Sequence, residues 1–149
     1  MSASKAIERL LHIRALEEEQ CRASLESALG EVDALKRAHQ AARQSERQGR
    51  ARVGTSAAAG EIVDRHAALV EMESARRRAR QLEPRIAASE LEAARRRQEF
   101  LAKRVERRQA GTLVEEAETQ DEIESSRRSQ KAVDDWYGAR RHSRKNNPR

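Results

Sequence analysis

A heptad repeat without proline constrains the first third of the chain more than any other feature. Between residues 5 and 48 there is no proline, and Gly30 is the one glycine. Small and aliphatic side chains recur there with the alternating four- and three-residue spacing that turns one stripe of a helix toward a partner helix. Eight of the eleven stripe positions are apolar or cysteine. The stripe consists of Ile7, Leu11, Arg14, Glu18, Cys21, Leu25, Ala28, Val32, Leu35, His39 and Ala42.

The composition agrees with long helices and not with a globule. Charged residues make up 38 % of the chain and aromatic residues 2 %, so the large apolar side chains of a compact core are scarce. Ala, Arg, Glu, Gln and Leu dominate, and these residues are strong helix formers. A disordered chain shares the high charge, but it has no reason to keep a heptad repeat.

A cluster of three glycines predicts where the chain folds back, because glycine ends helices. Gly49, Gly54 and Gly60 follow the repeat within a short segment. The predicted fold class is all-α: a long antiparallel two-helix coiled coil, an α-hairpin, with an overhanging C-terminal helix. One coiled-coil domain over 1–149 is expected, with helix 1 over about 5–48, a turn at 49–60, helix 2 over about 61–140 and a basic tail at 141–149.

The apolar residues of the second predicted helix follow two consecutive heptad frames. The change from the first frame to the second falls near Pro84. Since proline removes one backbone hydrogen bond, we expect a kink there and not a second turn. The first frame consists of Met72, Ala75, Ala79, Leu82 and Ile86, and the second consists of Ala87, Leu91, Ala94, Leu101 and Val105.

A turn centred near residue 52 predicts the pairing of the two helices. Leu35 would lie near Val70, His39 would lie near His66, and helix 1 would end opposite about residue 101. Residues 102–140 would then form a lone helix. Of the 27 residues from 106 to 132 only six are apolar, and such a polar helix is marginal in water. Its expected use is to be held by another protein.

No catalytic, cofactor or metal motif is present in the sequence. There is no glycine-rich nucleotide-binding loop, so we expect a protein that is not an enzyme and has no cofactor. His39 and His66 are more simply explained as histidines tolerated near a solvated turn than as a metal pair. Cys21, the one cysteine, suits a reducing compartment and a small apolar role in the seam. Without an apolar run of 18 residues we expect no membrane span and a cytoplasmic location.

Arginine clusters at 76–78, 95–97 and 103–108 are accompanied by acids at helical spacing, such as Glu92 before Arg96. A solvated, ion-paired surface explains them better than nucleic-acid binding, because stacking aromatics are missing. The acidic segment 115–124 has two readings of similar weight: a solvated surface, or a helix inside a polar protein channel. A nucleic-acid-associated coiled coil and a plain homo-oligomeric scaffold remain alternatives.

Two of the three aromatic residues, Trp136 and Tyr137, lie at the end of the predicted lone helix. Arg140 and Arg141 follow them, and the segment 138–149 contains no acidic residue. Exposed Trp and Tyr beside Arg are typical binding anchors. We therefore expect this segment to contact a partner.

Both ends of the chain resemble the YscO/FliJ-like (SctO) proteins of type III secretion systems. The resemblance lies in the N-terminal Ile-Glu-Arg-Leu-Leu-His-Ile-Arg of 7–14 and in the C-terminal segment 124–141. In the latter, Gln130-Lys131 precedes two acids, Trp136-Tyr137 and then two arginines. The N-terminal pattern favours the virulence or symbiosis branch over the flagellar branch.

The resemblance implies a non-enzymatic central stalk that inserts into a hexameric secretion ATPase and couples it to the inner-membrane export gate. Implied partners are the ATPase, the gate protein and export chaperones, with no nucleic acid, no membrane insertion and a monomer when free. The implied location is cytoplasmic, peripheral to the secretion apparatus of the inner membrane. The implied ATPase-ring contacts are Ile7, Leu10, Arg14, Trp136, Tyr137, Arg140 and Arg141. The gate-facing aromatics of the family are not matched, and this chain offers Leu35, His39, Val70 and Met72 near the turn.

Overall fold

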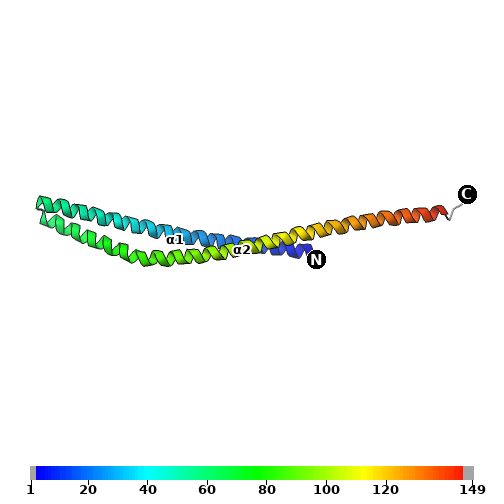
Figure 1. Cartoon of the computed structure of the whole chain (residues 1–149), viewed down its shortest axis with the longest axis horizontal. Coiled ribbons are helices and arrows are strands. Elements are labelled where there is room, and N and C mark those ends of the chain that lie inside the picture. Colours follow the sequence, from blue (N-terminus) through cyan, green and yellow to red (C-terminus); the bar gives the residue numbers. More distant parts are fainter. Residues whose placement is uncertain (1–2, 146–149) are drawn as a thin grey trace. The chain divides into compact units, whose positions relative to one another are not determined.

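The computed structural model describes residues 3–145, which form two helices and a short turn. Helix α1 is Ala3–Ala59 and helix α2 is Ile62–Lys145. The two helices pack against each other, and the described residues contain no strand. The predicted all-α helical hairpin is therefore confirmed (Figure 1). The chain divides into two units: Glu18–Lys103, and Met1–Glu17 with Arg104–Arg149.

The turn of the hairpin is much shorter than the predicted segment 49–60. Gly60 has a φ of +76°, which glycine adopts without steric penalty, and the Glu61 amide donates to the Ser56 carbonyl at 3.1 Å. This six-to-one bond beside a left-handed glycine is a Schellman motif. The Arg65 amide then donates to the Glu61 carbonyl at 3.1 Å, and Asp64 lies in the first turn of α2. The predicted end of helix 1 near residue 48 was wrong because only Gly60 acts as a helix cap.

Gly49 lies inside α1, and it serves close packing instead of ending the helix. A Cβ built there would lie 3.0 Å from the Met72 Cβ and 3.2 Å from the Met72 Cα and backbone nitrogen. A larger residue at this position would therefore push the two backbones apart. A Cβ built at Gly54 would have no atom within 4 Å, so this glycine serves no close packing.

The position of the turn sets the register of the pair, and the predicted register was wrong. Across unit Glu18–Lys103 the ion pairs Lys36–Glu90 and Arg52–Glu71 and the contact of His39 with Glu83 join α1 to α2. Leu35 therefore does not lie near Val70, and His39 does not lie near His66. The error follows directly from the turn, because moving the turn by about nine residues shifts every pairing by twice that amount.

The predicted stripe of α1 is the seam of the hairpin. All eleven of its positions are buried or half-buried. Beyond Ala42 the same spacing continues through Glu46, Gly49, Val53 and Ser56, which are likewise buried or half-buried. The heptad repeat therefore runs through the segment in which a turn was predicted.

The seam of α2 keeps one frame, and the predicted change of frame beside Pro84 was wrong. All five positions of the second predicted frame are exposed. The seam instead continues in the first frame, because a helix that remains unbroken keeps presenting the same face to its partner. The seam positions of this frame from Ile86 to residue 103 are Ser89, Ala93, Arg96, Phe100 and Lys103, all buried or half-buried, and Glu92 beside them is half-buried as well.

Pro84 lies inside α2 without interrupting it. Since proline has no amide hydrogen, the carbonyl of Arg80, four residues earlier, has no helical donor. Figure 1 shows α2 bending within its green part, which the colour bar places around residue 80. The prediction that Pro84 starts no second turn is confirmed.

The other unit contains the start of α1 and the second half of α2. Here Arg14 of α1 contacts Glu106 of α2, and Ala110 is buried. Val114 and Ala117 are half-buried, whereas every residue from 118 to 144 is exposed. The predicted lone helix at 102–140 was therefore too long at its beginning. Part of the predicted basic tail, up to Lys145, belongs to α2, and residues 146–149 lie outside the described residues.

No helix in the described part of the chain combines the length and apolar character that crossing a bilayer requires.

Candidate interaction surfaces

The exposed half of α2 ends in an aromatic and cationic patch formed by Trp136, Tyr137, Arg140, Arg141 and Arg144. The Trp136 and Tyr137 rings meet edge to face, with centroids 5.0 Å apart and planes at 80°. The Arg140 guanidinium lies 4.6 Å from the Trp136 ring centroid, one helical turn further along. Trp136 and Tyr137 nevertheless remain 53 % and 59 % exposed. We call this set the Trp136 patch.

The Trp136 patch has the chemistry of a protein-binding anchor. The cation–π contact and the ring pair hold the large side chains in place before a partner arrives. Tyr137, Arg140, Arg141 and Arg144 also line one hollow, so three arginine side chains border the same space. Such a group favours a partner that offers carboxylates beside an apolar pocket.

Arg14, by contrast, is occupied within the hairpin. Its Nη1 lies 2.8 Å from the Glu17 carboxylate and 2.7 Å from the Glu106 carboxylate. The hydrogen bond to Glu17 and then the charge of Glu106 raise the pKa of Arg14 above its usual value. Ile7 is half-buried in the seam, and Leu10 is partly exposed. Arg14 therefore serves first to pair the two helices.

The seven predicted ATPase-ring residues do not form one surface. Trp136 lies thirty residues beyond Glu106 on α2, which corresponds to about 45 Å of helix. Ile7, Leu10 and Arg14 therefore form one group, and the Trp136 patch forms another. The ring contact of either group stays a prediction.

The four predicted export-gate residues are also separated. Leu35 is buried in the seam, and Met72 is half-buried against Gly49. His39 lies in the seam beside Glu83, which precedes Pro84. Only Val70 presents an exposed side chain. The structure brings no two of these residues into contact among the interactions described here, and their role at a gate stays a prediction.

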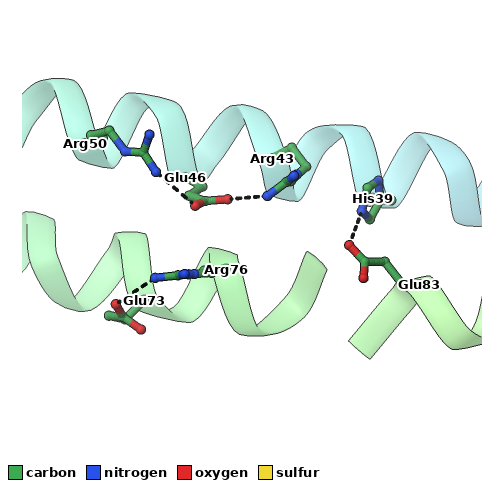
Figure 2. Close-up of polar contacts among 7 residues, drawn as sticks. All are labelled: His39, Arg43, Glu46, Arg50, Glu73, Arg76 and Glu83. Atoms are coloured by element: carbon green, nitrogen blue, oxygen red, sulfur yellow. Dashed lines mark hydrogen bonds and ion pairs between the residues drawn. The ribbon is translucent and has the colours of Figure 1, made fainter. Parts of the chain in front are cut away.

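Polar residues interrupt the seam at two places that Figure 2 shows together. His39 Nε2 is buried and lies 3.5 Å from the Glu83 carboxylate without making a hydrogen bond. Glu46 is buried between Arg43 at 3.1 Å and Arg50 at 3.4 Å, both on α1 (Figure 2). A carboxylate in such a position requires cationic partners, and the arginines one turn away on either side supply them. No group of three or more potential metal ligands occurs among the described residues.

Three arginines of the clusters, Arg76, Arg95 and Arg96, pair with acids of their own helix. Arg95 and Arg96 each lie 2.8 Å from the Glu92 carboxylate, and Arg76 lies 4.0 Å from Glu73. The hydrogen bond from Arg95, followed by that from Arg96, lowers the pKa of Glu92. Arg97 is different, since it makes no ion pair within the described residues and faces an open groove.

That groove belongs to a surface that sequence reasoning missed. The residues of the second predicted α2 frame, assigned to the seam, lie outside it, with Leu91 77 % exposed and Leu101 47 % exposed. A strict continuation of the spacing of Met72, Ala75, Ala79, Leu82 and Ile86 would have found this, because it leads to Ala93 and Phe100 and not to Leu91.

Comparison of the chain with protein-family models, with curated proteins and with solved structures gives no match.

Proposed function

We propose that the chain is the non-enzymatic central stalk of a type III secretion system, similar to YscO/FliJ-like proteins. One end of α2 would enter the hexameric secretion ATPase, and the hairpin would reach toward the export gate. Export chaperones are further proposed partners, and the free protein is proposed to be a monomer. The proposed location is the cytoplasmic face of the inner-membrane secretion apparatus.

The observation that carries the proposal is the exposed helix 118–144 with the Trp136 patch at its end. A helix without a partner helix is marginally stable in water, since most helical stability comes from packing. Its charges, acidic over 115–124 and basic from Arg140 onward, let it lie within a polar channel without adhering to one wall. The aromatic and arginine side chains at its end supply the one strong point of attachment.

Such a stalk would act through asymmetry. A single helix within a six-fold ring meets subunits in unlike orientations, so it binds some subunit conformations better than others. Differential binding of this kind shifts the populations of those conformations and favours ring assembly without any catalytic group.

The direct test mixes the purified chain with the secretion ATPase of its own organism. We expect more hexamer in analytical ultracentrifugation and faster ATP hydrolysis. The double variant Trp136→Ala, Arg140→Ala should lose most of the stimulation, whereas Ile62→Gln, an exposed apolar residue beside the turn, should keep it. If the wild-type chain changes neither hexamer formation nor hydrolysis, the stalk proposal fails.

The nucleic-acid alternative is tested by titrating duplex DNA at two salt concentrations. Arg95 and Arg96 already hold carboxylates, so these two arginines are less available to neutralise phosphates. We expect weak binding. Tight binding with a steep salt dependence would favour the alternative.

A further inference from the structure

The unit Glu18–Lys103 carries a second heptad stripe on the outside of α2. Ala87, Leu91, Ala94 and Leu101 are all exposed, and they follow the four- and three-residue spacing of a coiled-coil seam, with Gln98 at the missing step. A single exposed leucine needs no explanation, but a repeat of this kind does. The repeat marks a face of α2 suited to a further helix.

A groove between the two helices extends this face. It has a volume of about 480 Å³, and its apolar lining includes Leu25, Leu29 and Val32 of α1 with Ala93 and Ala94 of α2. Leu29 is 48 % exposed there. Because Ala94 belongs to both the groove and the stripe, the two form one apolar surface. We call it the Leu91 face.

Charges at the edges of the Leu91 face select its occupant. Arg95 follows Ala94 and Arg97 precedes Gln98, so the two arginines lie at opposite edges of the stripe. The acids nearest to them are occupied, since Glu90 holds Lys36 at 2.6 Å and Glu92 holds Arg95 and Arg96. The same pairing occupies Arg95, so Arg97 is the edge arginine that has no ion pair within the described residues.

A second copy of the chain fits this face poorly. The acids beside the stripe of a second copy are already paired, since Glu90 holds Lys36 and Glu92 holds Arg95 and Arg96. They therefore offer Arg97 no free carboxylate. A helix with carboxylates at its flanking positions would instead meet Arg97 favourably.

We propose that the Leu91 face binds an amphipathic helix of another protein, which packs an apolar stripe along α2 and places acidic residues against Arg97. The bound helix would complete a three-helix coiled coil over residues 87–101. This inference does not depend on the stalk proposal, because the Trp136 patch belongs to the other unit of the chain.

The probe for the test is a synthetic helix of four heptads with Leu at its a and d positions and Glu at its e and g positions. A matched peptide carries Lys in place of Glu. Binding of each fluorescently labelled peptide to the full chain is followed by anisotropy. One chain variant carries both Leu91→Gln and Leu101→Gln, and a second reverses one charge through Arg97→Glu. The control variant is Val63→Gln, at an exposed apolar residue outside the face.

We expect the Glu peptide to bind at least tenfold more tightly than the Lys peptide. The double glutamine variant should lose at least tenfold in affinity, and Arg97→Glu should narrow or reverse the preference between peptides. Val63→Gln should bind as the wild type does. Circular dichroism should find all variants equally helical, since the substituted side chains are exposed.

Three results would overturn the proposal: no saturable binding of the Glu peptide, equal binding of the two peptides, or binding that Leu91→Gln, Leu101→Gln leaves unchanged. A wild-type dimer that this double variant dissociates would assign the face to a second copy instead. ATPase stimulation by the same double variant separates the two proposals, because the stalk proposal predicts that it is retained.

Discussion

Two stretches of α2 carry the same apolar spacing and use it in opposite ways. In residues 68–82 the small side chains form the seam, and Ala75 is 0 % exposed. In residues 87–101 the apolar repeat lies outside, while Ser89, Ala93, Arg96 and Phe100 take the seam. The second stretch therefore leaves its two leucines, Leu91 and Leu101, exposed.

The difference teaches that the partner helix decides which repeat is buried. Lys36–Glu90, His39–Glu83 and the contact of Gly49 with Met72 all belong to one register, which the turn at Gly60 sets. Because α2 remains helical through Pro84, its face toward α1 cannot change to follow the larger side chains. The spacing of apolar residues along one helix therefore predicts that the helix has a seam. It does not predict which partner helix packs against that seam.

The sharpest test of this comparison enlarges an alanine in each stretch. Ala75→Leu forces a larger side chain into a closed seam and should lower the free energy of unfolding by about 1–3 kcal/mol. Ala94→Leu adds the same atoms at an exposed position and should change it by less than about 0.5 kcal/mol. Urea denaturation followed by circular dichroism measures both. Equal effects would mean that the two stretches are not packed differently.

Leu82 and Leu91 offer a second matched pair. Leu82 is half-buried, so Leu82→Gln should lower the free energy of unfolding by about 1 kcal/mol or more. Leu91→Gln should stay within about 0.5 kcal/mol of the wild type, because the side chain already meets water. A large loss of stability from Leu91→Gln would instead indicate that Leu91 is buried in the seam.

The two glycines inside α1 should respond to alanine with opposite sign. Gly54→Ala should raise the free energy of unfolding by about 0.5–1 kcal/mol, since alanine favours helix and the space is open. At Gly49 the new Cβ would press on the Met72 backbone, so Gly49→Ala should be destabilising. Thermal melts of the two variants measure this difference. A higher melting temperature than that of the wild type for both variants would contradict the close approach of Gly49 to Met72.

The smallest expected effect concerns pH. The arginines beside Glu92 hold its folded pKa below 4.5, so its pairing stabilises the folded chain above the unfolded pKa. That contribution is lost as the pH falls through the folded pKa. Glu92→Gln should therefore narrow the stability difference between pH 7 and pH 3 slightly, whereas Glu116→Gln, an exposed control, should not. Stability against pH, measured by urea titration, gives the comparison.

The fold and the α1 seam could be predicted because they depend on local regularities. A heptad stripe from Ile7 to Ala42 and a composition rich in helix formers leave few alternatives to paired helices. The exposure of Trp136 and Tyr137 followed from the low apolar content around them. The turn could not be placed because glycine has several uses: Gly60 caps a helix, Gly49 admits a neighbouring backbone, and Gly54 does neither.

The sequence by itself determined that this chain forms long paired helices, and that α2 continues past its partner into a polar segment ending in Trp136. Only the tertiary structure decided the register, the separation of Arg14 from the Trp136 patch, and the exposure of the Leu91 face. The physical reason is that periodicity along one helix is a local property, whereas register belongs to a pair. One residue in the left-handed conformation, Gly60, fixes the register of α1 against α2 within unit Glu18–Lys103.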